Sequence, residues 1–197
     1  RTLITSYDIW NNHAEKVFAV TRHWAQAHPN THQALLVALL EAAAWLDRPE
    51  NRLEACEMLA QGRYVNAPVD VLRMSMTGTF QFAPDEPPTN RPDFNVFQRY
   101  GATFPWRSHA VWTLSQMVRW GQVPAGTDLD AVARAVVWPE VYRSAAEIAG
   151  LNATRCIDVD QPLVAVRRHT YGTLTAEIAG HLFLEVGPAV RITDGRR

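Results

Sequence analysis

The chain has 197 residues, with 19 basic and 20 acidic side chains and a formal net charge of -1. This balance excludes binding driven by surplus positive charge, so neither nucleic acid nor an anionic membrane surface is an expected partner. Hydrophobic residues make up 47% of the chain and charged residues 20%, which indicates a globular protein. The longest apolar stretch, residues 35–46, contains Glu41 and is too short to span a bilayer, so the sequence predicts a soluble chain.

The first third of the sequence predicts one strand and three helices. A strand-like run, residues 2–6, and a polar turn precede the helices. The three helical patterns span residues 14–27, 30–47 and 49–62. Pro29 ends the first of them, and Pro49 lies in the first turn of the third. The apolar side chains of the third helix that we expect to point inward are Leu53, Cys56, Met58 and Leu59. The short connections between the three helices predict that they are antiparallel and pack in one layer.

In the middle of the chain the helical patterns give way to strand-like and proline-rich segments. A short helix over residues 69–76 and a strand over 77–82 precede a segment with four prolines, 83–92, which predicts a loop or crossover because proline removes backbone donors. Residues 94–104 are aromatic-rich and predicted to be extended. The later helices are expected over residues 107–121, 129–136 and 140–149.

An aromatic group surrounds the helix predicted to begin at residue 107. Its members are Phe97, Tyr100, Phe104, Trp106, Trp112 and Trp120. Aromatic side chains bury large apolar areas, so such a group is more often part of a core than a ligand platform. We therefore expect these rings to pack inside the protein.

Arg107, Ser108 and His109 begin this same helix and form the first candidate site. Neighbouring residues on a helix point about 100° apart, so Ser108 and His109 are poorly placed to share a proton, and no nucleophile elbow accompanies them. Arg107 opposes the helix dipole, which hints that an anion or a carboxylate lies nearby. A solvated arginine is an equally good interpretation of the same residue.

Metal binding and catalysis find little support in the sequence. Of the seven histidines, His28 and His32 are four residues apart, but Pro29 and a helix boundary separate them, so they cannot share a helical face. Cys56 and Cys156 lack metal-type spacing. We expect no catalytic residues, no metal and no cofactor.

Trp10, Asn11 and Asn12 form the second candidate site. They follow the predicted strand, and ligands of α/β proteins bind at the carboxyl ends of strands. Amide and indole groups donate hydrogen bonds without adding charge, which suits a small anion. The alternative is that both asparagines are ordinary turn residues, and the residues alone favour that alternative.

Several uncommon sequence words occur in order between residues 1 and 150. They are YDIWNNHAEKVF at 7–18, HPNT at 28–31, WLD at 45–47, PDFNVF at 92–97, FPWRSHAVW at 104–112 and QMVRWGQ at 116–122. In this order they resemble the nitrate-type solute-binding proteins of ABC uptake systems. That family has a two-lobed α/β fold of the periplasmic-binding-protein type (type II) and closes on nitrate, nitrite or bicarbonate.

The resemblance implies that this helix-rich α/β chain is the C-terminal half of such a fold. Residues 1–82 would form the end of the second lobe, with a strand and helices. Residues 83–150 would form the crossover and the return to the first lobe with C-terminal helices, and residues 151–197 are left unassigned. The N-terminal half of the same fold would be its structural partner.

The resemblance also implies a binding residue. Family members contact the anion near the residue that follows the tryptophan of the strand-end turn, often a lysine. That position is Asn11 here, between Trp10 and Asn12. The loss of the lysine removes a charge partner, which puts affinity and anion identity in question. Arg107, Ser108 and His109 would lie at the anion site or at a lobe contact.

The expected function is therefore non-enzymatic binding of nitrate or nitrite, with bicarbonate as another candidate anion. The protein would be the periplasmic component of an importer with an ABC permease and an ATPase. The alternative is a cytoplasmic nitrate sensor that controls an antiterminator-type regulator, or a regulatory domain fused to a transport ATPase. An enzyme of the related thiamine-precursor group is disfavoured, because no nucleophile and base pair is visible.

Overall fold

The computed structural model describes residues 2–9 and 15–151 of the chain. The described part is rich in helix and contains one small sheet. Its helices are α1 Ser6–Ile9, α2 Arg22–Ala27, α3 Pro29–Leu46, α4 Arg52–Ala60, α5 Val69–Met76, α6 Arg107–Arg119, α7 Leu129–Val136 and α8 Pro139–Ile148. Short 3₁₀ helices, η1 Pro49–Asn51 and η2 Arg99–Gly101, precede α4 and α6. The strands are β1 Thr79–Phe80 and β2 Thr89–Asn90.

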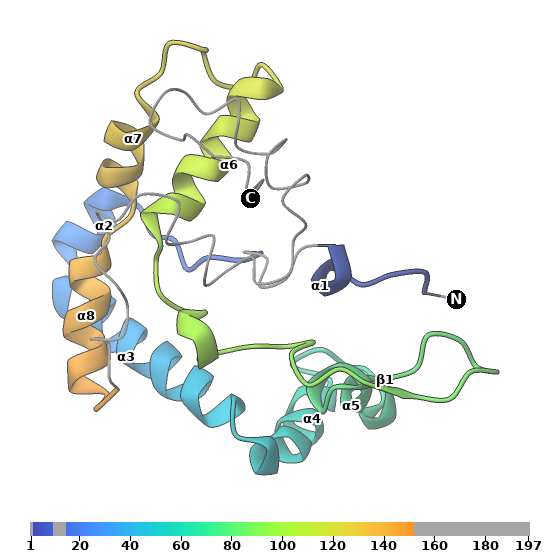
Figure 1. The fold of residues 1–197 in the computed structure, drawn as a ribbon. Coiled ribbons are helices and arrows are strands. Elements are labelled where there is room, and N and C mark those ends of the chain that lie inside the picture. Colours follow the sequence, from blue (N-terminus) through green and yellow to red (C-terminus); the bar gives the residue numbers. More distant parts are fainter. Residues whose placement is uncertain (1, 10–14, 152–197) are drawn as a thin grey trace, which may run out of the picture.

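The longer helices pack as pairs (Figure 1). Helix α3 lies against α8, α4 against α5, and α6 against α7. The predicted layer of three antiparallel helices is wrong, because α4 lies beyond the end of α3 and turns its buried face to α5. Short connections bring helices near one another, but the apolar faces decide which of them pack.

The first core joins α3 to α8. Its buried members are Leu40, Phe104, Tyr142, Ala145 and Ala146. The two alanines of α8 leave room for the larger side chains opposite, and the rings of Phe104 and Tyr142 meet edge to face with centroids 5.1 Å apart. This core therefore ties the segment before α6 to both helices.

The second core joins α4 to α5 through Ala55, Cys56 and Met76. Cys56 is fully buried as predicted, whereas Leu53 and Met58 are 48% and 43% exposed. The face of α4 that turns inward follows helical spacing and consists of Arg52, Ala55, Cys56 and, half-buried, Leu59. The prediction placed Leu53 and Met58 inward by hydrophobicity alone, and it missed a buried arginine on that face.

Most predicted helices are confirmed. Helices α5 and α7 have the predicted bounds, and α3, α6 and α8 differ by one or two residues at their ends. Pro29 both follows α2 and opens α3, where its missing N–H costs nothing. Helix α2 is much shorter than the predicted 14–27, because Thr21 caps it by accepting a hydrogen bond from the Trp24 N–H at 3.2 Å.

Residues 2–6 do not form the predicted strand. Thr2 donates a backbone hydrogen bond to the Phe82 carbonyl at 2.9 Å, but no ladder follows, and α1 begins at Ser6. Thr5 and Asp8 cap this turn reciprocally: the Asp8 N–H donates to Thr5 Oγ1 at 3.3 Å, and the Thr5 N–H donates to Asp8 Oδ2 at 3.2 Å.

The predicted strand over 77–82 shrinks to β1, which pairs antiparallel with β2 in the register Thr79 to Asn90 and Phe80 to Thr89. The proline-rich segment thus holds a short strand as well as a loop. Residues 94–104 are not simply extended, since η2 interrupts them. Of the aromatic group, Phe104 is buried while Tyr100 and Trp120 are 60% and 68% exposed, so the core prediction is only partly correct.

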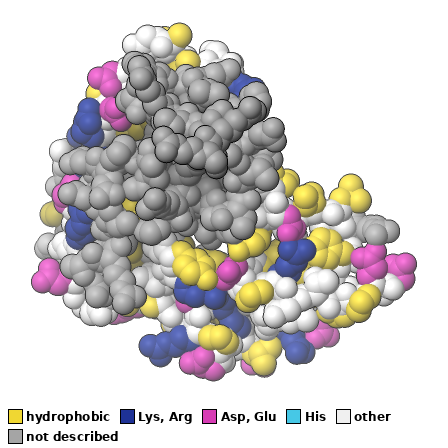
Figure 2. Space-filling model, viewed as in Figure 1, with side chains coloured by type: hydrophobic (Ala, Val, Ile, Leu, Met, Phe, Trp, Pro, Cys, Tyr) yellow, Lys and Arg dark blue, Asp and Glu magenta, His cyan; other side chains and the backbone are white. Residues whose placement is uncertain are grey.

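On the face shown in Figure 2, apolar side chains lie among charged and polar ones over the region of α4, α5 and β1. Of the helices in the described part of the chain, none combines the length and the apolar character needed to cross a bilayer. The described residues also bring no three His, Cys, Asp or Glu side chains together as metal ligands would be.

Candidate functional site

The candidate anion contacts Trp10, Asn11 and Asn12 lie outside the described residues. Their role therefore stays a prediction. The structure does describe the segment that leads to them, residues 2–9, and shows what holds it in place.

Two side chains of α1 fix this segment to the loop after β2. Asp8 forms an ion pair with Arg91, whose guanidinium also lies over the Phe82 ring, 5.4 Å from its centroid. The Tyr7 hydroxyl donates to Asp93 Oδ2 at 3.5 Å. The ion pair thereby joins Asp8 to a residue 83 positions later in the sequence. The start of the chain is thus attached to the crossover segment.

The Asp8 carboxylate is held in its ionised form. A hydrogen bond from the Thr5 hydroxyl, 2.6 Å long, is the largest cause that lowers the pKa of Asp8. Burial opposes this effect, and Arg91 adds to the lowering. Arg91 therefore balances the negative charge of Asp8, which lies two positions before Trp10 in the sequence.

Arg107, Ser108 and His109 begin α6 as predicted. Arg107 Nη2 lies 3.1 Å from Glu140 Oε1 in the first turn of α8, so a carboxylate does lie near this helix start. The His109 ring lies beside Trp106, with centroids 6.5 Å apart. The structure thus assigns Arg107 a contact between helices, and a role of the three residues at an anion site stays a prediction.

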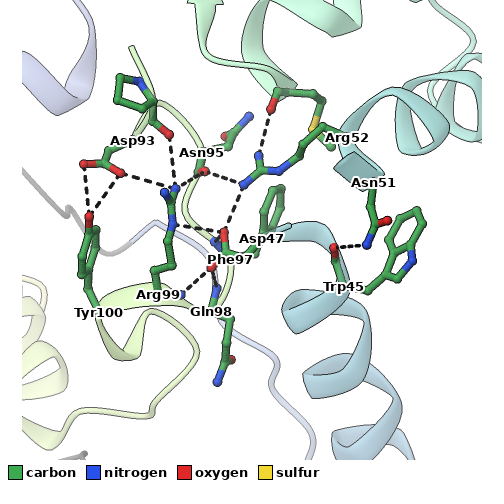
Figure 3. A network of polar contacts seen from close by, with 12 residues as sticks. Trp45, Asp47, Asn51, Arg52, Asp93, Asn95, Phe97, Gln98, Arg99 and Tyr100 are labelled. Carbon is green, nitrogen blue, oxygen red and sulfur yellow. Dashed lines mark hydrogen bonds and ion pairs between the residues drawn. The ribbon is translucent and has the colours of Figure 1, made fainter. Parts of the chain in front are cut away.

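The structure contains a buried polar network around Asp47 that the sequence did not predict (Figure 3). The Asp47 side chain, at the end of α3, is 7% exposed and lies in an ion pair with Arg52 at 3.0 Å. Its oxygens also accept the backbone N–H groups of three successive residues: Phe97, Gln98 and Arg99. One carboxylate therefore joins α3, the start of α4 and the segment before η2.

Arg52 holds the other side of this network. It donates to the carbonyl oxygens of Met76 at 3.0 Å and Asn95 at 3.2 Å, and its guanidinium lies 4.8 Å from the centroid of the Phe97 ring. Burial is the largest influence on Arg52 and lowers its pKa, while Asp47 opposes that shift. One signal could have revealed the network: Asp47 is an acid at a helix C-terminus, where the helix dipole disfavours it.

Comparison with known proteins agrees with the resemblance in the sequence words. A family model described as the NMT1-like family matches residues 1–60. Over 147 residues, 73% of this chain, the sequence is 31% identical to the nitrate/nitrite binding protein NrtA of Synechocystis sp., of which the match covers 32%. The chain belongs to the nitrate/bicarbonate-type ABC solute-binding protein family.

The fold leads to the same family. The crystal structure of the periplasmic nitrate-binding protein NrtA from Synechocystis PCC 6803 matches 71% of this chain with a TM-score of 0.67 and 29% identity. That match covers 36% of the NrtA chain, so the present chain spans about a third of its relative. The predicted fold class, a helix-rich portion of a periplasmic-binding-protein-like fold, is confirmed.

A second kind of relative is a transport ATPase. The chain is 32% identical over 151 residues to the bicarbonate transport ATP-binding protein CmpC of Synechococcus elongatus. That match covers 77% of this chain and 22% of CmpC. The family segment therefore also occurs within proteins whose names describe ATP binding.

Proposed function

We propose that the chain binds nitrate or nitrite as the C-terminal portion of the solute-binding component of an ABC uptake system. The observation that carries this proposal is the combined match to NrtA, at 31% sequence identity and a TM-score of 0.67. Bicarbonate is the other candidate anion, because a bicarbonate transport protein matches at a similar identity, 32%.

Trp10, Asn11 and Asn12 are the proposed anion contacts. Neutral donors can replace the water around a partly desolvated anion when the lobes close on it. The contacts of Asp8 with Arg91 and of Tyr7 with Asp93 support this role, because they fix the segment that leads to these residues. Arg107, Ser108 and His109 are proposed for a second anion contact or for the interface between the lobes.

The proposed division of the chain follows the sequence boundaries. Residues 1–82 would complete the second lobe, and residues 83–150 would cross and return to the first lobe. The remaining partners would be the N-terminal half of the fold, an ABC permease and an ATPase, with binding in the periplasm. The activity is binding without chemical conversion of the anion.

The match to CmpC favours one alternative. The chain would then be a cytoplasmic, nitrate- or bicarbonate-responsive regulatory domain of a transport ATPase. The observation behind it is the 32% identity to a protein that is named for ATP binding. A cytoplasmic sensor that controls an antiterminator-type regulator is a further form of this alternative.

Isothermal titration tests the proposal. The purified chain is titrated with nitrate, nitrite, bicarbonate and sulfate, alone and with the remaining portion of the fold added as a second polypeptide. We expect saturable nitrate or nitrite binding when both portions are present. Saturation by bicarbonate alone would reassign the anion, and no binding of any anion would overturn the proposal.

One variant tests the proposed contact residue. Asn11→Lys restores the charge that family members often carry there and should tighten nitrate binding, since an added cation near a desolvated anion strengthens their attraction. The matched control is Asn30→Lys on the exposed first turn of α3, which should leave the affinity unchanged. Equal effects of the two substitutions would remove Asn11 from the site.

A further inference from the structure

We propose that the backbone at residues 97–99, together with Arg52 and Arg99, is a built binding site for a small planar oxyanion. Its resident ligand is the carboxylate of Asp47. Occupation of this site by an anion holds the segment before η2 against α3 and α4. The proposal is independent of the nitrate site considered above, since none of its residues is a proposed nitrate contact.

The backbone donors converge on one carboxylate. The Phe97 N–H donates to Asp47 Oδ1 at 3.1 Å, and the Gln98 N–H donates to Asp47 Oδ2 at 2.5 Å. The Arg99 N–H donates to the same Oδ2. Successive N–H groups that point into one concavity form an anion-binding nest, and this arrangement requires no particular side chain at the three positions.

Two guanidinium groups complete the site from opposite sides (Figure 3). Arg52 Nη2 lies 3.0 Å and Arg99 Nε lies 3.5 Å from Asp47 Oδ1. The side chains of Asp47 and Arg52 are each 7% exposed, so little water competes for either charge. A buried arginine whose anion is removed is an uncompensated charge. Binding of another anion next to it is therefore favourable.

The two guanidinium groups also have contacts that do not involve Asp47. Arg52 is bound to the carbonyls of Met76 and Asn95. Arg99 donates to the Pro92 carbonyl at 3.2 Å and lies 3.4 Å from Asp93 Oδ1. The two guanidinium groups should therefore stay close to their present positions when the Asp47 carboxylate is absent, which favours the binding of a free anion between them.

The chemistry of the donors selects the ligand. Substitution Asp47→Ala removes a carboxylate group, and formate replaces the lost atoms as a separate molecule. Asp47→Gly leaves room for acetate by the same reasoning. Nitrate is also a planar oxyanion with one negative charge, whereas sulfate carries two charges and has more oxygen atoms than the carboxylate that it would replace.

The experiment measures the thermal unfolding midpoint and the refolding yield of the full chain at constant ionic strength, with formate replacing chloride. We expect Asp47→Ala to have a lower midpoint than the unsubstituted chain in chloride. Formate should raise that midpoint with a saturating dependence on concentration, because a ligand that binds the folded state stabilises it by mass action. If the variant does not fold in chloride, its refolding yield should rise with formate.

Two controls separate site binding from general salt effects. Asp47→Asn keeps an occupant in the site, so its midpoint should not respond to formate. Asp93→Ala removes a carboxylate that contacts the Arg99 side chain and the hydroxyls of Tyr7 and Tyr100 but accepts none of the three backbone N–H groups. The unfolding midpoint of Asp93→Ala should therefore not respond to formate either.

The proposal is overturned if formate and chloride give Asp47→Ala the same midpoint and the same refolding yield. It is also overturned if Asp93→Ala responds to formate as strongly as Asp47→Ala. Addition of Arg52→Met to Asp47→Ala should weaken the formate response severalfold, and an unchanged response would exclude Arg52 from the site.

Discussion

Two charged residues lie at helix ends where their own helix disfavours them. Asp47 follows the C-terminus of α3, and Arg107 opens α6. Each meets an opposite charge from elsewhere in the chain: Arg52 for the first and Glu140 for the second. An unfavourable local charge thus indicates a tertiary partner, although the sequence does not say which residue that partner is.

Removal of the Arg52 charge should be costly. Arg52→Met leaves the Asp47 carboxylate without its 3.0 Å partner in a site where both side chains are 7% exposed. Breaking a buried pair from one side costs about 3–5 kcal/mol of the free energy of unfolding, measured by urea denaturation. The control is Arg73→Met, whose 3.7 Å pair with Asp70 is solvent-exposed and should cost at most about 1 kcal/mol. Equal losses would contradict this account.

The contribution of Asp8 should depend on pH. Its pKa is lowered from 3.8 in the folded protein, chiefly by the Thr5 hydroxyl, so folding favours the ionised carboxylate. This stabilisation is fully present above the unfolded value and is lost as the pH falls through the lower, folded pKa. Asp8→Asn should therefore lower the thermal midpoint at neutral pH, and the difference should shrink below pH 3.8.

The control for this pH dependence is Asp70→Asn. The Asp70 side chain is 93% exposed and lies in a loose pair with Arg73, so its substitution should change the midpoint little at any pH. A difference between Asp8→Asn and the unsubstituted chain that persists unchanged into acid would show that the Asp8 charge does not stabilise the fold.

At the scale of elements, helices were predictable where proline, caps and an apolar face agree. Helix α3 has Pro29 in its first turn and no side-chain cap, whereas the Asp128 side chain caps the start of α7 by accepting a hydrogen bond from the Ala131 N–H. The prediction of a strand over residues 2–6 is wrong because the apolar run ends in the reciprocal cap of Thr5 and Asp8, which begins a helical turn. The pairing of helices was also missed, since it depends on which faces meet and not on the lengths of connections.

The hairpin of β1 and β2 depends on Gly78. This residue has φ +71°, and a Cβ there would lie 2.5 Å from the Arg91 carbonyl oxygen. Gly78→Ala should lower the free energy of unfolding through backbone strain and by a further ~1–3 kcal/mol, because backbone atoms must move to make room for the Cβ. The matched control is Gly121→Ala, with φ +73° and no atom within 4 Å, which carries only the strain of about 1–2 kcal/mol. Equal unfolding free energies would argue against the close approach.

The contact of α3 with α8 can be tested at adjacent leucines. Leu40 is 3% exposed in the first core, and Leu40→Ala should cost about 2–5 kcal/mol through lost burial and a cavity. Leu39, one position earlier, is 46% exposed, so Leu39→Ala should cost about 1 kcal/mol or less. Urea denaturation of both variants measures the difference, and a larger loss at Leu39 would mean that the face of α3 is assigned wrongly.

At the scale of the whole molecule, the family was predictable and the site only in part. Rare sequence words, such as those around Trp45 and Trp106, identified the family where hydrophobic periodicity gave only a helix-rich class. The charge network of Asp47 and Arg52 could not be predicted, because its partners come from segments up to 52 residues apart that only the fold brings together. Asn11 was proposed from the resemblance, and its test lies in binding measurements.

The last prediction concerns the chain as a separate molecule. Its match covers 32% of NrtA, and large apolar side chains are exposed, among them Val17 at 86%, Trp120 at 68% and Val136 at 64%. Exposed apolar surface of this kind favours association. We expect the purified chain to self-associate increasingly with concentration in sedimentation velocity, and to do so less when the remaining portion of the fold is added. A chain that stays monomeric at all concentrations, with nitrate bound tightly, would show that the binding site does not require that portion.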